Sequence, residues 1–278
     1  MSLFIASLNS GSNGNCYYIG SPTEAVLIDA GISCRETERR MKSLGLSMKT
    51  VKAIFISHEH SDHIKGLPVI AEKFMIPVYI TADTGKYFAV KLKKKAFNPF
   101  IAFEPVNIGS LSITAFPKYH DAADPHSFII TGMGITIGVF TDLGVCCNRV
   151  IQYFSRCNAA FLETNYDEVM LQNGTYPVYL KKRISGGLGH LSNNQALEIF
   201  KNHRPAFMSH LLLSHLSKDN NSPEIVEQLF TPHAGSTKII VASRDKHTAL
   251  YQIAQQRVPL NIPGTTISLR PVQMNLFE

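Results

Sequence analysis

Short apolar runs rich in β-branched and aromatic residues recur along the chain, separated by polar or glycine-containing stretches. Such runs predict β-strands, here at residues 3–8, 15–20, 25–29, 53–57, 77–81, 101–106, 111–116, 127–131, 135–140, 159–164, 207–214, 238–243 and 266–271. Between them lie segments with the apolar spacing of an amphipathic helix. Helices are expected at residues 34–45, 63–74, 145–155, 193–203 and 222–230.

The order of these segments indicates the fold class. Hairpin-like strands come first, strands alternating with helices follow, and a second run of the same kind comes after. Such a chain suits two mixed β-sheets packed face to face with helices on their outer faces, an α/β (α+β) arrangement. No Pro/Gly/Ser-rich linker divides the two halves, so a single domain over residues 1–278 is expected.

Composition supports a folded protein of enzyme size. Hydrophobic residues make up 45% of the chain and charged residues 17%, with no low-complexity tract. The opening residues lack a basic leader, and their apolar run is too short for a secretion signal or a membrane span, so a cytoplasmic protein without membrane contact is expected. The five cysteines form no CxxC pair and are expected to be buried thiols.

The charge balance leans towards anionic partners. Lys and Arg outnumber Asp and Glu by 27 to 21, and basic residues gather at 91–95 (KLKKK) and 181–183 (KKR). Either cluster can contact a phosphate backbone. For clusters this short, charge alone favours a solvated surface, so the choice depends on the chemistry elsewhere in the chain.

The stretch ISHEHSDHIKG, residues 56–66, carries the most specific chemistry. Directly after the apolar run AIFI it places four ionisable side chains within six positions: His58, His60, Asp62 and His63. His58 and His60 are two apart, so in an extended segment they project to one side and can hold one metal. Asp62 and His63 are adjacent and must diverge, which suggests a second metal. Helix capping, the structural alternative, does not call for three imidazoles at this spacing.

Three later apolar strands also end in residues that bind metals. ITAFPKYH ends in His120, ITIGVFTD ends in Asp142, and HLLLSH ends in His215. A single strand-end histidine or aspartate is usually a cap or a turn residue. Imidazole and carboxylate together suit Zn²⁺, Mn²⁺ or Fe²⁺, and the lack of a nearby thiolate argues against a closed structural zinc site.

In this order the residues resemble the HxHxDH signature and the later ligands of the metallo-β-lactamase-fold hydrolases. The resemblance implies an αββα sandwich with a dinuclear site at one edge. It implies one metal held by His58, His60 and His120, a second held by Asp62, His63 and His215, and Asp142 bridging them. Two divalent cations follow, Zn²⁺ or Mn²⁺ with Fe²⁺ as a further candidate, together with catalysis by a hydroxide held between them.

Two further residues resemble those that serve the leaving group in ribonuclease Z-like nucleases. His190 stands before a helix in SGGLGHLSNNQA, and Glu163 ends the strand that follows Asp142. The resemblance implies that both are catalytic, along with Asp62 of the signature. The alternatives are a helix-terminal residue without chemistry for His190 and a strand-end cap for Glu163. Of the two HLS histidines, His215 is the preferred ligand, because it ends an apolar strand.

The stretches SGSNGNCYYI, SHEHSDHIKG, YHDAADP, GHLSNNQA and SHLSKDNNSPE look like one branch of the superfamily, the YycJ/WalJ-type bacterial hydrolases. This resemblance implies a cytoplasmic nuclease with 5′-to-3′ exonuclease activity on DNA, in the context of DNA repair. Ser12 and Asn13, in the glycine-rich opening, are expected to bind substrate, because backbone N–H groups can approach an anion there. The alternative for this loop is a tight turn between two strands.

Residues 165–183 are the best candidate for gripping nucleic acid, because the chain is too short between Asp142 and His215 for a large inserted domain. Tyrosines there can stack on bases and basic residues can contact phosphate. These residues are Tyr166, Tyr176, Tyr179, Lys181, Lys182 and Arg183. Core packing is an equally good interpretation of the tyrosines.

The expected function is thus that of a nuclease, with nucleic acid, and DNA in particular, as its substrate. Two other functions are the alternatives. A small-molecule thioester or lactone hydrolase would use the same metal ligands. A metal-binding scaffold without activity fits less well, because all seven ligand types are present. The basic clusters, His190 and the branch resemblance favour phosphodiester hydrolysis.

Overall fold

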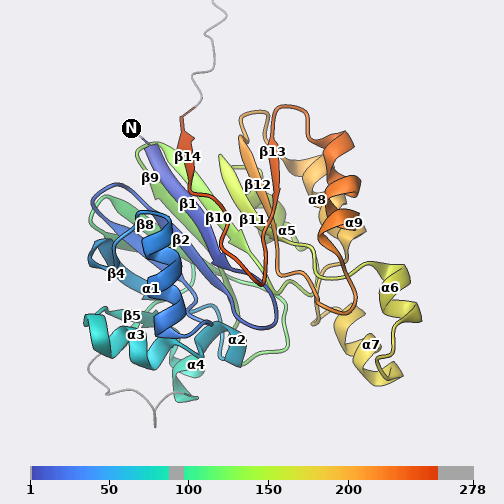
Figure 1. Cartoon of the computed structure of the whole chain (residues 1–278), viewed down its shortest axis with the longest axis horizontal. Coiled ribbons are helices and arrows are strands. Elements are labelled where there is room, and N and C mark those ends of the chain that lie inside the picture. Colours follow the sequence, from blue (N-terminus) through green and yellow to red (C-terminus); the bar gives the residue numbers. More distant parts are fainter. Residues whose placement is uncertain (1, 88–96, 256–278) are drawn as a thin grey trace, which may run out of the picture.

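The computed structural model describes residues 2–87 and 97–255 (Figure 1). The basic run at 91–95 and the strand expected at 266–271 therefore lie outside the described residues. Within the described ranges, no helix has the length and apolar character needed to cross a membrane.

In this part of the chain the first sheet has seven strands, in the order β14-β1-β2-β3-β4-β5-β6. An antiparallel half consists of β14 (Tyr251–Ala254), β1 (Ser2–Asn9), β2 (Cys16–Gly20) and β3 (Ala25–Ile28). From β3 the sheet continues as a parallel half through β4 (Val51–Phe55), β5 (Val78–Ile80) and β6 (Phe97–Pro99). Strand β14, which the sequence pattern did not predict, covers the free edge of β1.

The second sheet repeats this plan, with the order β13-β12-β11-β10-β9-β8-β7 among the described strands. Its antiparallel half consists of β7 (Pro105–Ile108), β8 (Leu111–Pro117), β9 (His126–Gly132) and β10 (Ile135–Phe140). Its parallel half continues through β11 (Ala159–Glu163), β12 (His210–Ser214) and β13 (Lys238–Val241). Each sheet thus changes from antiparallel to parallel at one strand, β3 or β10.

Alternating side chains of both sheets form the core between them. Leu3 and Ile5 of β1 and Phe161 of β11 belong to this central cluster. The intervening residues face outwards, Phe4 against the helices on one side and Leu162 against those on the other. Because both faces of these strands are covered, the strands are continuous apolar runs in the sequence rather than alternating ones.

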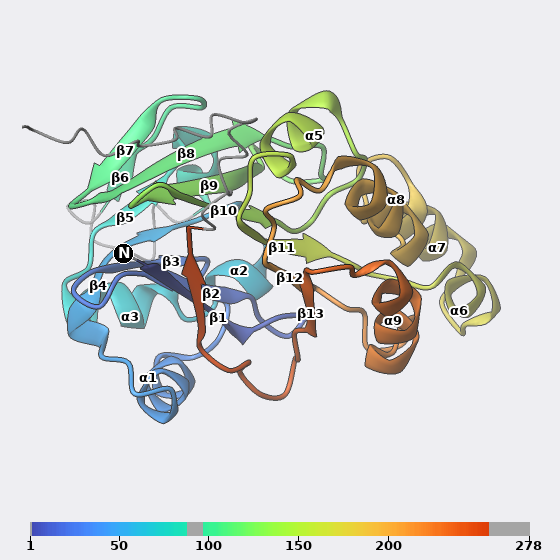
Figure 2. The same cartoon turned by 90° about the horizontal axis from the view of Figure 1, so that it is seen from above.

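Helices cover the two outer faces (Figure 2). The first sheet is covered by α1 (Cys34–Ser43) and α3 (Leu67–Phe74), which contribute Met41 and Ile70 to the outer core. The second is covered by α5 (Asn148–Phe154), α8 (Asn193–His203) and α9 (Pro223–Phe230), each of which buries a phenylalanine: Phe154, Phe200 and Phe230. Ser222 caps α9 by accepting a hydrogen bond from Ile225 N. The expected αββα sandwich is confirmed.

Two expected elements are wrong in their bounds. Residues 63–74 form two helices, α2 (Ser61–Ile64) and α3, rather than one. The break falls at Gly66, where a Cβ would overlap the carbonyl oxygen of Ile32, and Pro68 in the first turn of α3 favours a new start there. The strand expected at 101–106 is β7 instead, which begins only at Pro105.

Several short helices were not predicted by the periodicity, because each buries at most one of its residues and so has no apolar stripe. They are η1 (Met48–Thr50), α4 (Ala82–Lys86), α6 (Glu168–Asn173), α7 (Val178–Ser185) and η3 (Thr231–His233). The pair α6 and α7 falls in the region expected to grip nucleic acid. These two helices project beyond the second sheet, at the lower right of Figure 1.

The strand directions bring separate chain segments to one edge. Strands β3 and β4 are parallel, and so are β10, β11 and β12. Strand β8 runs in the same direction as β10, because each is antiparallel to β9. The segments that follow these strands therefore meet at a common edge, the lower edge in Figure 1.

Candidate metal centre

Three side chains at this edge leave their strands through left-handed backbone. Asp29, Asp142 and His215 follow β3, β10 and β12 and have φ values of 62°, 55° and 59°. For residues other than glycine this conformation costs roughly 1 to 3 kcal/mol. The fold therefore tolerates strain at the places where these side chains turn off the strands towards one another.

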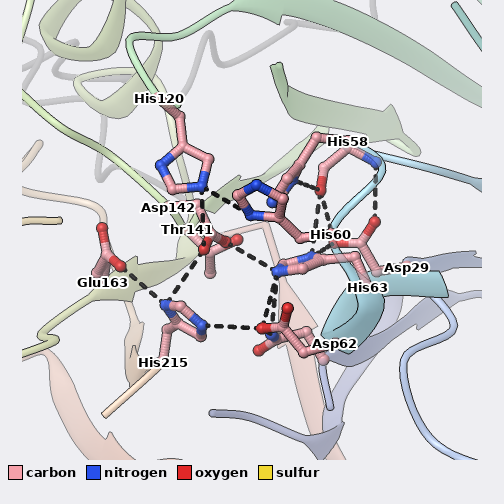
Figure 3. A network of polar contacts seen from close by, with 12 residues as sticks. Asp29, His58, His60, Asp62, His63, His120, Thr141, Asp142, Glu163 and His215 are labelled. Carbon is pink, nitrogen blue, oxygen red and sulfur yellow. Dashed lines mark hydrogen bonds and ion pairs between the residues drawn. The ribbon is translucent and has the colours of Figure 1, made fainter. Parts of the chain in front are cut away.

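We call His58, His60 and His120 the first ligand group. Each offers a ring nitrogen, and these nitrogens lie within 4.8 Å of one another. His58 Nδ1–H donates to Ser57 Oγ at 2.9 Å, and His120 Nδ1–H donates to Gly189 O at 3.0 Å. Both rings are thereby held through Nδ1 by neutral acceptors. His58 Nε2 has no partner, and His120 Nε2 lies 3.4 Å from His60 Nδ1, among the other candidate ligands (Figure 3).

We call Asp62, His63 and His215 the second ligand group, whose ligand atoms also lie within 4.8 Å of one another. Here the imidazoles are held by buried carboxylates. His63 Nδ1–H donates to Asp29 Oδ2 at 2.7 Å, and His215 Nδ1–H donates to Glu163 Oε1 at 2.9 Å. Such carboxylate partners fix the orientation of a ligand ring and make it more basic.

Asp142 lies between the two groups. Its Oδ2 is 3.3 Å from His63 Nε2, and its Oδ1 is 3.9 Å from His120 Nε2. It also forms a possible metal-binding set with His58 and His63. The aspartate expected to bridge two metals thus contacts members of both groups.

Two members of the first group, His58 and His120, are set up to be uncharged. Burial lowers the pKa of His58 well below its ordinary value, and nearby positive charge on His63 and Lys118 lowers it further. Burial likewise lowers the pKa of His120 to about 4. A neutral imidazole is the form that binds a metal, so these two rings need lose no proton first.

The second group is set up to be charged. Burial alone would lower the pKa of His63, but the carboxylates of Asp142, Asp62 and Asp29 raise it well above its ordinary value. Burial would also lower the pKa of His215, but the carboxylates of Asp142, Asp62 and Glu163, the last of which accepts a hydrogen bond from the ring, raise it to about 10.

Three buried atoms at the centre have no hydrogen-bond partner among the described residues: His58 Nε2, Asp142 Oδ2 and His215 Nε2. Leaving such an atom without a partner costs about 1 to 3 kcal/mol. All three are atom types that bind divalent cations, and imidazoles with carboxylates fit Zn²⁺, Mn²⁺ or Fe²⁺. The two ligand groups and Asp142 therefore fit a pair of divalent cations.

Glu163 links the second group to His190. Its Oε1 accepts hydrogen bonds from His190 Nδ1 at 2.8 Å and from His215 Nδ1, while its Oε2 accepts from the backbone N–H of Leu143 at 2.6 Å. Burial would raise the pKa of Glu163, but His190 and His215 lower it to about 2. The carboxylate is fully buried and stays ionised, so it holds both rings in place.

A pocket of about 380 Å³ opens over the centre. His60, Asp62, Asp142, His190 and His215 line its floor. Its rim carries Ser12, Tyr176, Leu180, Arg183 and Ile184, three of which lie on α7. Helix α7 thus forms one wall of the pocket.

Only part of the expected substrate-binding set lies at this pocket. Ser12 and Arg183 line it, and Arg183 Nε also donates to Asp121 Oδ2 at 2.6 Å. Within the described residues, Asn13, Lys181 and Lys182 are not part of the lining. Asn13 Nδ2 donates to Arg244 O at 2.9 Å, and Lys181 Nζ donates to Gln172 O at 2.7 Å.

The three tyrosines expected to stack on bases differ in position. Tyr166 is only 4% exposed and belongs to the core, as the alternative interpretation had it. Tyr176 lines the pocket and donates to Asp219 Oδ2 at 2.7 Å. Tyr179 is 74% exposed on α7.

Asn15 is a site residue that the sequence analysis missed. Its fully buried amide donates to Asp62 Oδ2 at 3.2 Å and lies 3.1 Å from His63 Nε2. Tyr17 O–H donates to Asn15 Oδ1 at 3.0 Å, and the Tyr17 oxygen lies 2.8 Å from Ser10 Oγ. Ser10 Oγ accepts from His215 N at 2.7 Å. The opening loop thus connects ligands that come from the two sheets.

Lys118 was also missed. Its buried Nζ donates to Thr141 O at 2.7 Å and lies 4.0 Å from Asp142 Oδ2. Burial lowers the pKa of Lys118. The only sequence signal was its place between a strand end and His120, which does not distinguish it from a surface lysine.

Residues 24–215 match a family model described as a β-lactamase superfamily domain. Exodeoxyribonuclease YycJ of Bacillus anthracis is 33% identical over 228 residues, which cover 81% of this chain and 86% of that protein. Exodeoxyribonuclease WalJ of Streptococcus pneumoniae is 30% identical over 260 residues, covering 88% and 96%. The crystal structure of the metallo-β-lactamase fold protein YhfI from Bacillus subtilis has a TM-score of 0.69 at 16% identity, covering 91% of this chain and 100% of that one.

Proposed function

The chain belongs to the β-lactamase superfamily, in its YycJ/WalJ-type branch. On this premise we propose that it is a 5′-to-3′ exonuclease that hydrolyses DNA with two divalent cations. One observation carries the proposal. Two ligand groups that share Asp142 lie under one pocket, and a histidine held by a carboxylate lies beside them.

The six residues of the two ligand groups, together with Asp142, are proposed to hold the cations. These are Zn²⁺ or Mn²⁺, with Fe²⁺ as a further candidate. When bound, such a pair supplies an activated water at neutral pH and takes up charge on the attacked phosphoryl oxygens. Asp29 and Ser57 orient the imidazoles of His63 and His58. Asp62 is proposed both to bind a cation and to orient the attacking water.

His190 is proposed to protonate the leaving alkoxide. Its Nδ1 is occupied by the hydrogen bond to Glu163, so Nε2 is the nitrogen left to carry a proton towards the pocket. Imidazole is the side chain most often used for general acid catalysis. Glu163 keeps the ring oriented and stabilises the imidazolium that precedes proton transfer.

Ser12 and Arg183 at the pocket rim are proposed to contact substrate, with Lys181 and Lys182 on the same helix contributing positive charge to the approach. A cytoplasmic location and a role in DNA repair form part of the proposal. All five cysteines are free thiols, a state typical of proteins in reducing compartments.

The test is cleavage of 5′-labelled and 3′-labelled single- and double-stranded DNA and RNA by metal-stripped protein, with Zn²⁺ or Mn²⁺ added back. His58→Ala serves as the inactive control. We expect metal-dependent release of mononucleotides from the 5′ end of DNA, absent from the variant. Cleavage of RNA alone would contradict the choice of DNA, and no cleavage with any metal would move the assignment to thioester or lactone hydrolysis.

A further inference from the structure

A second, smaller cavity lies beside the pocket over the metal centre. It measures about 140 Å³, and its lining includes Ser10, Ser217, Lys218, Arg244 and Asp245. Ser217 also lines the larger pocket, so the two cavities share a wall. We propose that this cavity, named here the Arg244 subsite, binds a backbone phosphate of the nucleic acid one or more nucleotides away from the scissile bond. The subsite rests on the proposed nuclease function.

The backbone of the subsite is held rigidly. Arg244 and Asp245 lie on the loop between β13 and β14, which reaches the same edge of the molecule as the loop after β1 (Figure 1). Asn13 Nδ2 donates to Arg244 O at 2.9 Å, and Ser10 N donates to Ser243 O at 3.1 Å. Arg40, buried under this loop, donates from Nη2 to Asp245 O at 2.9 Å.

The guanidinium of Arg244 forms no ion pair in the described part of the chain and has an unmet buried donor. Its Nη1 is buried and makes no hydrogen bond there. Neither Arg244 nor Lys218 forms an ion pair with a described carboxylate, in contrast to Arg40, which pairs with Glu36, and Arg183, which pairs with Asp121. A buried donor on a cation is costly to leave unmet, and a phosphate oxygen satisfies both the charge and the hydrogen bond.

The remaining lining suits the same ligand. The hydroxyls of Ser217 and Ser243 offer neutral donors, since each is otherwise only an acceptor, and Asp245 is the one acidic residue of the lining. The cavity has less than half the volume of the pocket over the metals. It therefore suits a phosphate group better than a nucleobase with its sugar.

The subsite lies close to the metal centre. Ser10 accepts a hydrogen bond from the backbone N–H of the candidate ligand His215 and also lines the subsite. The loop after β1 therefore lies between the metal centre and the subsite. A strand with one phosphodiester over the metals runs across Ser217 to place a further phosphate at Arg244.

The test measures binding without turnover. A fluorescein-labelled single-stranded deca-thymidylate is titrated with metal-stripped protein in EDTA, and anisotropy is followed at several salt concentrations. Arg244→Gln is compared with Arg156→Gln, which removes the same charge from an exposed position between α5 and β11, away from the site edge. Arg244→Lys keeps the charge, and a thermal melt of each variant checks folding.

We expect Arg244→Gln to weaken binding about tenfold and to flatten the plot of log affinity against log salt by about 0.7, the value for one phosphate contact on a single strand. Arg156→Gln should bind as the wild type does, and Arg244→Lys should recover most of the affinity. Equal affinity of wild type and Arg244→Gln, equal weakening in both Gln variants, or no binding by the wild type would each overturn the subsite. Weakened binding by Arg244→Gln alone, in a wild type that cleaves no nucleic acid, would overturn the nuclease function and leave the subsite standing.

Discussion

The first and second ligand groups are built largely from the same side chain but are held by different partners. In the first group His58 and His120 donate to a serine hydroxyl and a backbone carbonyl. In the second, His63 and His215 donate to the buried carboxylates of Asp29 and Glu163. The first pair is neutral without metal, whereas the second pair carries protons that a metal must displace.

The difference indicates how unequal metal sites arise within a few ångströms of each other. Carboxylate partners add negative charge, which strengthens a bound cation but also stabilises a proton in its place. Neutral partners orient the ring without that competition. Metal binding by the second group should therefore depend more strongly on pH than metal binding by the first group, although both share Asp142.

Removing the shared residue should have the largest effect. Asp142→Ala takes a ligand from both groups, so we expect both cations to be lost and turnover to fall by roughly 10³-fold or more, equivalent to about 4 kcal/mol of transition-state stabilisation. Metal content by mass spectrometry and the turnover number measure this. Asp83→Ala, an exposed aspartate paired with Lys86, is the control. Retention of one full equivalent of metal would show that Asp142 belongs to a single group.

Replacing His190 tests which histidines make up the second group. Because His190 can form a metal-binding set with Asp142, Glu163 and His215, its role as an acid has to be separated from ligation. We expect His190→Gln to lower the turnover number about 10²-fold and to keep both metals. The exposed His233→Gln provides the matched control. A variant that binds one metal fewer would make His190 a ligand.

The carboxylate partners can be removed one at a time. Glu163→Gln should weaken the cation of the second group by about tenfold, within the range of 10 to 100 typical of such partners. Asp29→Asn should weaken both cations, because Asp29 also accepts hydrogen bonds from Ser57, which holds His58. Stepwise titration calorimetry distinguishes the two patterns. Identical effects of the two variants on both binding steps would contradict the division into groups.

The last expected effect concerns the pH dependence of metal binding, in the protein without any substitution. In metal-free protein the pKa of His215 is raised to about 10, so at pH 8 and pH 7 the ring is protonated and a cation must displace that proton. Affinity of the second group should fall by about tenfold for each proton displaced as the pH is lowered by one unit. His58 and His120 should require no proton displacement over this interval, because the pKa of His58 is lowered well below its ordinary value and that of His120 to about 4. Competition with a chelator at the two pH values measures both; parallel slopes would contradict the comparison.

The seven candidate ligands could be predicted because each stands at or just after the end of an apolar run. His120 and His215 are examples, since both follow strands that the hydrophobic pattern locates well. Strand direction then carries them to a common edge. The sequence also located Glu163 and His190 correctly beside each other, but only through the resemblance, because nothing in the spacing of 27 residues brings them together.

Asn15 and Arg244 could not be predicted, because their roles depend on contacts far away in the chain. Asn15 reaches Asp62 across 47 positions, and the carbonyl of Arg244 is held by Asn13 across 231. Helices α6 and α7 were missed for a local reason: α6 buries only Leu171 and α7 buries no residue, so neither has the apolar stripe of a helix that packs on the core. The basic run at 91–95 is a prediction outside the described residues.

The origin of the ligands in both sheets has a consequence for the order in which the protein assembles. His58 and His215 come from different sheets, so the complete centre exists only after the sheets have docked, late in folding. A cation bound by the native state alone raises the free energy of unfolding by about 2.7 kcal/mol at a concentration 100 times its dissociation constant. In a chelator the protein should therefore unfold at a lower temperature than in the presence of metal. The melting temperature then reports how much of the protein has metal bound.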